Sequence, residues 1–458
     1  MRRGVRRAGP GVLALWCGLG AAGPVAGQDS VPPVEQGVRL GITYTPGMRP
    51  GLLVLGGPSE AVLDSVRTIL RRDLDHSDRF ELISLPSGDS LILGLSDLGT
   101  GAGGLATAGF VNYGLYAALG AEYSVAVLPG QGAGPPVVTV YDVRGESVRS
   151  RIPIVVTDVR DREFRMAVHR AADDVVRAAT GLPGIAASRV LFVQGDRLYG
   201  IDADGAGLTG LSPAGEKTFS PAWDPTGRRL AYAVLAGGAG RVYLQDAASG
   251  RRTLVAPTGT ALNWTAALSP DGRGIAFARA GEEGTDIYTY NVGQDCCLQR
   301  LTVGRFSDNL SPTFSPDGRR IAFVSTRAGL PQIYVMSADG TGQELFAPFD
   351  YGVTGSSQAP EWSPDGTQLA FHRDVAGSPQ VFIMNVRSRD VRQLTSAGRN
   401  EDPTWAPDSR HIAFVSNRTG TRQVWVIDIE TGRVRQLTSA GGTRLPAWSP
   451  RIPEVTNP

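Results

Sequence analysis

One short phrase recurs six times in the second half of the chain, and its spacing constrains the fold more than any other feature. Most copies read Pro-x-aromatic-x-Pro, followed by turn residues such as Asp-Gly. The second proline of each copy stands at Pro225, Pro270, Pro316, Pro364, Pro407 and Pro450. Successive copies are therefore 43 to 48 residues apart, a period that is typical of solenoids and propellers.

The residues between the copies decide between these two architectures. In the third repeat, an apolar run at 321–323 is followed by a second run at 333–336 and by an Asp339-Gly340 turn. Such β-branched and aromatic runs, separated by Gly and Asp, indicate short strands joined by hairpins. With the phrase itself and a last strand such as 393–395, each unit has four strands, which make one propeller blade. The 3.6-residue apolar period of helical repeats is absent from these units.

The two ends of the repeat array complement each other. The sixth phrase, at 446–450, supplies only a first strand, and the strands that it lacks resemble the segments 189–193 and 197–201. We therefore expect the C-terminal strand to join these segments in one composite blade, which leaves no open sheet edge. This predicts a six-bladed propeller over residues 188–451, closed by its C-terminal strand, with 452–458 as a tail.

The polar and aromatic residues of the repeated phrase have structural interpretations. Asp271, Asp317 and Asp365 stand in Ser-Pro-Asp-Gly turns, in which Pro presets φ, Asp bonds to its own backbone and Gly adopts positive φ. We expect these aspartates to stabilise turns rather than to bind a ligand. The repeated Trp or Phe is expected in the core.

The first half of the chain, at 38–183, shows no such repeat and predicts a small α/β domain. Its expected strands are 38–44, 123–128 and 137–141. Residues 60–73 are expected to form a helix with Ala61, Val62, Val66 and Leu70 on one face, and 161–179 has a clear helical period of apolar residues. Gly181 and Pro183 end this helix and begin a linker. The predicted fold class is therefore α+β, with two domains.

The N-terminus has the pattern of an export signal. Four arginines precede a short apolar stretch and the small residues 25–27, which predicts a signal peptide at 1–27. Its removal would change the net charge from +1 to −3, since it holds four arginines and no acid. Residues 28–37, with two prolines, are expected to form a flexible arm. No later segment is long and apolar enough for a membrane helix, and the low net charge argues against nucleic acid as a partner.

The sequence offers no convincing catalytic, cofactor or metal site, so we expect no enzyme. The four histidines are scattered without metal-ligand spacing, and no G-x-S-x-G nucleophile motif is present. A G-x-G-x-x-G match at 99–104 lies in a Gly/Ala-rich stretch and is better explained as a loop than as a dinucleotide site. Asp202-Ala-Asp204-Gly205 resembles the start of a calcium loop, but its place in the blade favours a hairpin turn. Cys296 and Cys297 are adjacent and form either a vicinal disulfide or two free thiols in an ordinary loop.

The mouth of the central channel is the natural binding surface of a propeller, and the loops before each phrase lead to it. These loops mix aromatic, amide and charged side chains, as binding loops often do, although each residue taken alone also fits an ordinary solvated loop. The candidate partner-binding residues are Lys217, Phe219, Asn263, Trp264, Asp308, Asn309, Asn400, Glu401, Asp402 and Arg444.

Signal, small α/β domain and six repeats in this order resemble the TolB family of the Tol–Pal envelope system. The likeness covers nearly all of the mature chain. It is strongest at 363–366, at 369–371, at Gly181 with 189–193, and at the terminal 445–450. Residues 120–123 resemble the helix-to-strand junction of the family, and 166–179 its long helix. The replacement of Pro-x-Trp by Ala267-Leu268 and the glycine-rich stretch depart from the family pattern.

The resemblance implies a monomeric periplasmic protein that binds partners and supports outer-membrane integrity and envelope constriction at cell division. Its propeller mouth would bind the lipoprotein Pal, and its N-terminal arm would bind TolA, with other envelope proteins as possible further partners. The arm residues implied by this are Gln28, Asp29, Val31, Val34 and Glu35. Three alternatives stay open at this point: an exported propeller scaffold with another protein partner, a small-ligand-binding propeller, and an exported hydrolase.

Overall fold

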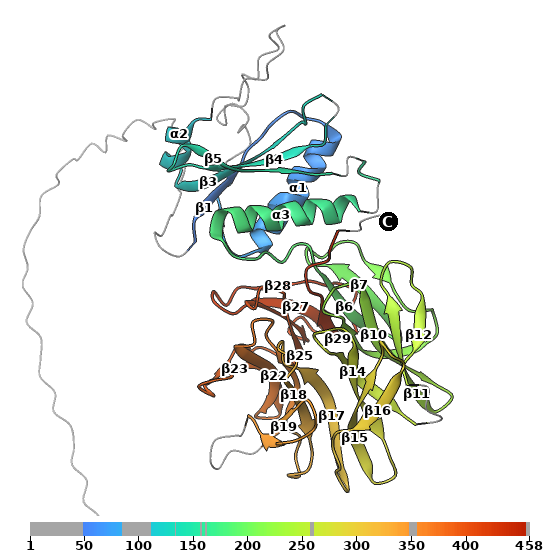
Figure 1. Ribbon diagram of the computed structural model, residues 1–458. Coiled ribbons are helices and arrows are strands. Elements are labelled where there is room, and N and C mark those ends of the chain that lie inside the picture. Colours follow the sequence, from blue (N-terminus) through green and yellow to red (C-terminus); the bar gives the residue numbers. More distant parts are fainter. Residues whose placement is uncertain are drawn as a thin grey trace, which may run out of the picture. The chain divides into compact units, whose positions relative to one another are not determined.

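A computed structural model of the protein describes residues 49–84, 111–132, 134–155, 158–160, 163–256, 261–347 and 355–454 (Figure 1). The expected signal peptide, the arm at 28–37, the expected strand at 38–44 and the glycine-rich stretch at 86–109 lie outside the described residues. In the described part of the chain, no helix combines the length and the apolar character that crossing a membrane requires.

The N-terminal part contains one five-stranded sheet with the order β2-β1-β3-β4-β5 (Figure 1). Strand β1 pairs in parallel with β2 and β3, and the remaining neighbours are antiparallel. The strands are β1 (Gly51–Val54), β2 (Glu81–Leu82), β3 (Ala121–Leu128), β4 (Val137–Asp142) and β5 (Ser147–Pro153). The helices are α1 (Ala61–His76), α2 (Tyr113–Ala118) and α3 (Phe164–Thr180).

Strand alternation divides the core of this sheet between its two faces. Leu52, Val125 and Val138 pack with α1 and α3 in one cluster, whereas Leu53 and its neighbours pack with α2 in another. The two expected long helices are confirmed, with small shifts of their ends. The expected apolar face of the first helix was partly wrong, since Ala61 is exposed and Leu63 is buried with Val66 and Leu70.

The residues from 189 to 448 form six sets of four strands, of which five are continuous in the sequence. The first of these sets is β9 (Lys217–Trp223), β10 (Arg229–Ala236), β11 (Ala239–Asp246) and β12 (Arg252–Leu254). The second is β13 (Asn263–Leu268), β14 (Gly274–Ala280), β15 (Gly284–Asn291) and β16 (Cys296–Arg300). The third is β17 (Ser307–Phe314), β18 (Arg320–Ser325), β19 (Gln332–Ser337) and β20 (Glu344–Leu345). A short parallel pairing of β15 with β17 joins the second and third sets into one sheet.

The remaining sets complete the repeat. The fourth is β21 (Ser357–Trp362), β22 (Gln368–Val375), β23 (Ser378–Asn385) and β24 (Val391–Gln393). The fifth is β25 (Asn400–Trp405), β26 (His411–Ser416), β27 (Gln423–Asp428) and β28 (Val434–Gln436). The sixth combines β29 (Thr443–Trp448) with β6 (Arg189–Gln194), β7 (Arg197–Asp202) and β8 (Thr209–Gly210). The expected pairing of the C-terminal strand with 189–193 is thus confirmed, over a register that includes Trp448 opposite Val190.

The middle of each second strand is buried on both faces, which explains why the Ile-Ala-Phe motif does not alternate between apolar and polar residues. Ile321, Ala322 and Phe323 are all fully buried, because neighbouring sets of strands cover both sides of the sheet. The aromatic residue packs on a ring of the third strand, as Phe323 does on Tyr334 with 5.9 Å between ring centroids. Such pairs add about 0.5–1.5 kcal/mol each beyond their buried area.

The turns between the first and second strands have the expected geometry. Asp317 Oδ1 accepts hydrogen bonds from Ser315 Oγ at 2.6 Å and from the backbone N–H of Arg319 at 3.1 Å. Gly318 adopts a positive φ of 71° and donates its N–H to the Ser315 carbonyl. The equivalent contacts of Asp271 and Asp365 repeat this pattern, so their structural role is confirmed.

Candidate functional site

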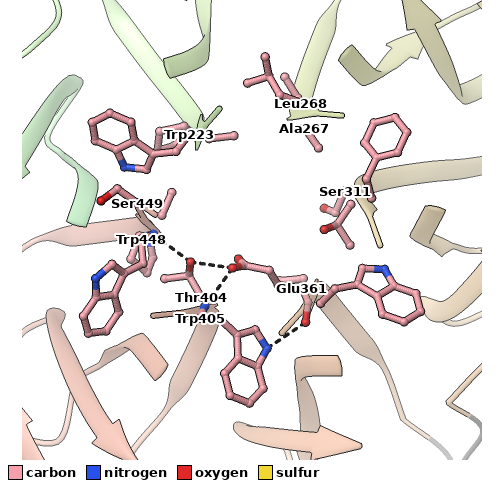
Figure 2. A pocket seen from close by; sticks show the side chains of 18 of the residues that line it. Trp223, Ala267, Leu268, Ser311, Glu361, Thr404, Trp405, Trp448 and Ser449 are labelled. Carbon is pink, nitrogen blue, oxygen red and sulfur yellow. Dashed lines mark hydrogen bonds between the residues drawn. The ribbon is translucent and has the colours of Figure 1, made fainter. Parts of the chain in front are cut away.

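The first strands of the six sets surround a common cavity of about 650 Å³ (Figure 2). Figure 2 shows side chains of these strands around it, among them Trp223, Leu268, Ser311, Glu361 and Trp405. The repeated aromatic residue therefore has two roles. Trp405 and its equivalents Trp362 and Trp448 are buried as expected, whereas Trp223 and Phe314 are only partly buried at the cavity wall.

A bulge interrupts every first strand at the same place, beside the cavity. The pairing register with the second strand shifts there in all six sets. One residue at each bulge has a positive φ between 46° and 53°: Ser220, Thr265, Ser311, Ala359, Asp402 and Leu445. This backbone conformation costs a non-glycine residue about 1 kcal/mol or more. The bulges place all six residues in the lining of the cavity.

Glu361 is the centre of the polar contacts at the cavity wall (Figure 2). Its Oε1 atom accepts hydrogen bonds from Thr404 Oγ1 at 3.0 Å and from the backbone N–H of Trp405 at 2.9 Å. Thr404 Oγ1 in turn accepts from the backbone N–H of Trp448 at 2.9 Å. Burial raises the pKa of Glu361 to about 7, and the two hydrogen bonds oppose this rise.

Asp402 is a second carboxylate of the cavity. Burial raises its pKa, and the nearby His372 opposes the rise. His372 Nδ1 accepts a hydrogen bond from the backbone N–H of Asp402 at 3.1 Å. The third carboxylate, Asp224, is held in its turn by Arg229 and Thr226. Among the described lining residues these carboxylates stand with tryptophans, prolines and small hydroxyls. The arrangement is suited to binding.

The structure places the predicted mouth residues at the amino-terminal ends of five first strands. Lys217 and Phe219 lie on β9, Asn263 and Trp264 on β13, and Arg444 on β29. The two remaining groups are Asp308 with Asn309 on β17, and Asn400, Glu401 and Asp402 on β25. All of them therefore lie at or before the bulges, and only Asp402 also lines the cavity.

The three predicted asparagines are buried and hold the strand ends in place. Asn263 Nδ2 donates to the Gly240 carbonyl at 3.2 Å, Asn309 Nδ2 to the Thr285 carbonyl at 3.1 Å. Asn400 Nδ2 donates to Gln380 Oε1 at 2.7 Å. Lys217 and Asp308 are exposed, and the other predicted residues are partly exposed. A partner at this surface would meet these seven side chains rather than the asparagines.

The sequence reasoning missed two exposed apolar residues at the same end of the strands. Phe306 has 86% of its surface exposed and Val303 76%, and both stand in the loop that leads into β17. The backbone N–H of Phe306 donates to the Glu283 carbonyl at 2.6 Å, which ties this loop to the preceding set. The sequence signal that could have found this surface was two apolar residues, Val303 and Phe306, in a short segment with Gly304 between two predicted strands. Exposed aromatic residues on a tied loop are typical anchors for a protein partner.

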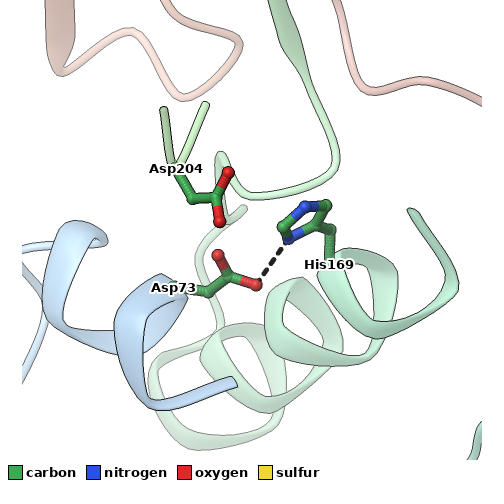
Figure 3. Close-up of side chains that lie close together, drawn as sticks. All are labelled: Asp73, His169 and Asp204. Atoms are coloured by element: carbon green, nitrogen blue, oxygen red, sulfur yellow. Dashed lines mark hydrogen bonds and ion pairs between the residues drawn. The ribbon is translucent and has the colours of Figure 1, made fainter. Parts of the chain in front are cut away.

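A buried cluster around His169 connects the N-terminal sheet region with the propeller (Figure 3). His169 Nδ1 lies 2.7 Å from Asp73 Oδ2, and its Nε2 lies 3.7 Å from Asp202 Oδ2. Asp204 pairs with Arg165 at 2.6 Å. Burial alone would lower the pKa of His169, but the surrounding carboxylates raise it to about 10. The imidazole is therefore a buried cation at neutral pH.

A second cluster around His411 has the same design. His411 Nδ1 lies 2.8 Å from Asp408 Oδ2 in the propeller, and its Nε2 lies 3.2 Å from Asp78 Oδ2 in the N-terminal region. Burial would lower its pKa, but both carboxylates raise it. Arg433 and Arg410 extend the network through Asp78 and Asp428.

The expectation that the histidines are merely scattered was therefore wrong for two of the four. Asp73, His169 and Asp204 offer atoms within 4.8 Å of one another, as do Asp78, His411 and Asp428, which is a spacing that a metal ion can use. Arginines already pair with three of the four carboxylates of these two clusters, namely Asp78, Asp204 and Asp428. The clusters are therefore explained as ion-pair networks. The turn at 202–205 is a turn as expected, with the Gly205 N–H donating to the Asp202 carbonyl, but its aspartates also face His169.

The two cysteines outside the N-terminal segment are joined. Cys296 and Cys297 form a vicinal disulfide at the start of β16, with 3.8 Å between their Cα atoms. Of the two states that the sequence left open, a vicinal disulfide and two free thiols, the structure has the disulfide. The pair lies on the outermost strand of the second set, away from the residues that line the cavity.

Fold and site define a β-propeller protein with an N-terminal sheet-and-helix region and a cavity suited to binding. The chain belongs to the TolB β-propeller family, because the model of the TolB beta propeller domain matches residues 176–348 and 351–455. It is similar to the Protein TolB homolog of Chlorobium luteolum, with 31% identity over 190 residues, which are 40% of this chain and 42% of the relative. It is also similar to the Tol-Pal system protein TolB of Bordetella pertussis, with 30% identity over 208 residues, 44% of this chain and 47% of the relative.

The aligned part of the chain thus spans less than half the length of these curated relatives. Among solved structures, TolB from Acinetobacter baumannii matches with a TM-score of 0.73 and 22% identity, over 89% of this chain and 98% of that chain. At this identity the likeness concerns the fold, and it extends through the N-terminal region as well as the propeller.

Proposed function

We propose that the protein is a non-enzymatic component of a Tol–Pal system that acts in the periplasm and binds its partners through two separate surfaces. The observation that carries this proposal is the match of the TolB propeller model across 176–348 and 351–455. The name of the Bordetella pertussis relative, a Tol-Pal system protein, supports it. The export signal that the sequence predicts at 1–27 supports the periplasm as its location.

The proposed propeller is a closed ring of six blades, one for each set of four strands. Contacts between first strands support this arrangement, because they run in the order β9, β13, β17, β21, β25 and β29, and β29 also contacts β9. The pairing of β29 with β6 supports closure by the C-terminal strand. Such a ring presents one mouth at the amino-terminal ends of its first strands.

The mouth is the proposed binding surface for the lipoprotein Pal. Exposed or partly exposed side chains from several blades gather there, with Trp264, Asp308 and Glu401 as the central candidates. Phe306 extends the surface with an apolar anchor. The combination of aromatic and charged groups on a rigid scaffold is typical of protein-binding surfaces.

The second proposed surface is the N-terminal arm, through Gln28, Asp29, Val31, Val34 and Glu35, which would bind TolA. These residues lie outside the described part of the chain, so the proposal relies on the family alone. Capture of the arm by TolA would alter the engagement of Pal, and the system would thereby support envelope integrity and constriction at division.

Calorimetric titration of the mature protein with Pal from the same organism tests the proposal. We expect saturable 1:1 binding that Trp264→Ala, Asp308→Ala or Glu401→Ala weakens. Asp390→Ala is the matched control, because Asp390 is an exposed aspartate in the turn between β23 and β24, at the other end of the strands. Absence of binding by the intact protein would refute Pal as the partner. An affinity for Pal that stays unchanged after deletion of 28–37, measured in the presence of TolA, would refute the role of the arm.

A small-molecule role for the cavity is the second candidate function. Its volume of about 650 Å³ is within the range of ligand pockets, and Glu361 supplies a polar anchor in it. A rise in the unfolding temperature with a particular metabolite, lost in Glu361→Ala, would favour this function over a scaffold with another protein partner.

A further inference from the structure

A second cavity, of about 580 Å³, lies between helix α1, strand β2 and the turn that connects β27 with β28. It is distinct from the cavity at the propeller axis, with which it shares no lining residue. Four arginines line it and come from three separate segments: Arg49 before β1, Arg71 and Arg72 on α1, and Arg433 of the propeller. This convergence of guanidinium groups distinguishes it from an ordinary surface hollow.

The carboxylates of the lining neutralise only half of this charge. Glu81 is engaged by Arg49 at 2.5 Å, and the carboxylate of Asp75 accepts three hydrogen bonds from Arg433, at 3.0 to 3.2 Å. With four arginines and two acids, the lining keeps two positive charges, and these belong to Arg71 and Arg72.

The contacts of these two arginines are weak substitutes for a bound anion. Arg71 donates to the neutral hydroxyl of Ser84 at 2.7 Å. Arg72 Nη1 lies 3.4 Å from Asp204 Oδ2, an oxygen that already accepts from Arg165 at 2.6 Å. Both side chains are exposed on one face of α1, one helical turn from Thr68 and Asp75.

The surroundings of the cavity hold charges of both signs. In the described part of the chain, the buried Nε and Nη2 atoms of Arg435 have no hydrogen-bond partner. Burial lowers the pKa of Arg435 to about 10, and burial with the nearby Arg435 lowers the pKa of His76 to about 4. Asp73 is engaged by His169. Asp78 contacts His411 and also pairs with Arg433 at 2.9 Å and with Arg49 at 3.7 Å, so its charge is balanced by these two arginines and not by Arg71 or Arg72.

Strand β2 gives the cavity a backbone wall. Among the described strands it is the edge of its sheet. The N–H groups of Glu81 and Ile83 donate to β1 and the segment before it, at 3.0 Å each. The N–H and C=O of the intervening Leu82, which lines the cavity, are therefore directed away from β1. An extended peptide can pair with such an edge.

We propose that the groove between α1 and β2 binds an acidic peptide segment in an extended conformation, with its carboxylates on Arg71 and Arg72. Carboxylates are the anions that the other two arginines of the lining already hold, and planar guanidinium groups recognise them with paired hydrogen bonds. The site is separate from the proposed Pal surface and does not depend on it.

Fluorescence anisotropy of the mature protein with labelled hexaglutamate tests the proposal, with hexaglutamine as the neutral probe. We expect hexaglutamate to bind at low salt, more weakly as salt rises, and hexaglutamine not to bind. The double variant Arg71→Gln/Arg72→Gln should bind hexaglutamate about tenfold more weakly or worse, the usual loss for charged hydrogen bonds. Arg177→Gln, at an exposed arginine of α3, is the matched control and should bind as the parent does.

Three results would overturn the proposal. They are equal affinity of the double variant and the parent, equal binding of hexaglutamine, and preferential binding of inorganic phosphate, which would assign the groove to small anions. Thermal unfolding checks that the variants are folded, and we expect unfolding temperatures close to that of the parent because both arginines are exposed. Trp264→Ala should leave hexaglutamate binding intact, and the double variant should leave Pal binding intact, so that failure of either proposal is recognised separately.

Discussion

Replacement of His169 by glutamine is expected to destabilise the protein at neutral pH and to remove part of its pH dependence. The imidazole is fully buried between Asp73 and Asp202. Burial alone would lower its pKa, but the carboxylates raise it from 6.5 to about 10. The folded protein therefore binds a proton at His169 that the unfolded chain releases near neutral pH.

The sign and the size of the effect follow from this proton. A group whose pKa is raised by folding stabilises fully below its unfolded pKa, and the stabilisation is lost as pH rises through the folded pKa. For His169 this window extends from pH 6.5 to about pH 10. Each pH unit within it corresponds to about 1.4 kcal/mol, so the contribution below the window is at most about 5 kcal/mol. Loss of one partner of a buried ion pair costs about 3–5 kcal/mol, which agrees in size.

Thermal unfolding of the parent and of His169→Gln at several pH values inside this window measures the effect. We expect the two unfolding temperatures to differ most near the lower end and to converge as pH rises. His372→Gln is the matched control, because the ring of His372 lies 3.9 Å from the nearest carboxylate oxygen, that of Asp402. A difference between parent and His169→Gln that stays constant across the window would refute the assignment of a buried proton to His169.

Three further predictions concern the propeller. Glu361→Gln should raise the free energy of unfolding by about 1–3 kcal/mol above pH 7. Folding raises the pKa of the Glu361 carboxyl group to about 7, so the folded protein keeps this group protonated, and that stability is lost as pH rises toward about 7. Unfolding temperatures that are equal at pH 6 and pH 8 in parent and variant alike would contradict this prediction. Phe323→Ala should cost about 3–5 kcal/mol in urea unfolding, because its ring is fully buried between neighbouring sets. Phe306→Ser should change stability by less than about 0.5 kcal/mol, since the ring is exposed, while it weakens Pal binding in calorimetry; intact affinity would remove Phe306 from the proposed surface.

The repeated parts of the fold were predictable because each repeat carries the same local signals. Spacing, strand alternation and the Asp317-Gly318 turn are properties of neighbouring residues, and six copies reinforce one another. The pairing of β29 with 189–194 was predictable for a related reason, since the sixth repeat lacked strands that the start of the array supplied. The same reasoning could not place the bulges, because a positive φ at Ala359 or Leu445 has no signature in the residue type.

The candidate sites were less predictable, because their contacts join residues that are far apart in the chain. Asp73 and His169 are separated by 96 positions, and Asp78 and His411 by 333. No local period connects such residues, and a histidine on a strand or helix looks the same whether or not an aspartate faces it. Burial of Asn263, Asn309 and Asn400 was missed for a similar reason, since an amide beside a turn fits both a solvated loop and a strand-end clamp.

Strand β25 shows how the two kinds of contact share one element. Its amino-terminal end carries Glu401 of the proposed Pal surface, and Asp402 at its bulge lines the axial cavity. The turn that follows its carboxyl-terminal end carries Asp408, which holds His411 and through it Asp78 of the N-terminal region. The proposed partner surface and the contacts to the N-terminal region therefore lie at opposite ends of the same strand. Between these two ends, Glu361 of the neighbouring strand β21 holds β25 by accepting hydrogen bonds from Thr404 and from the backbone N–H of Trp405.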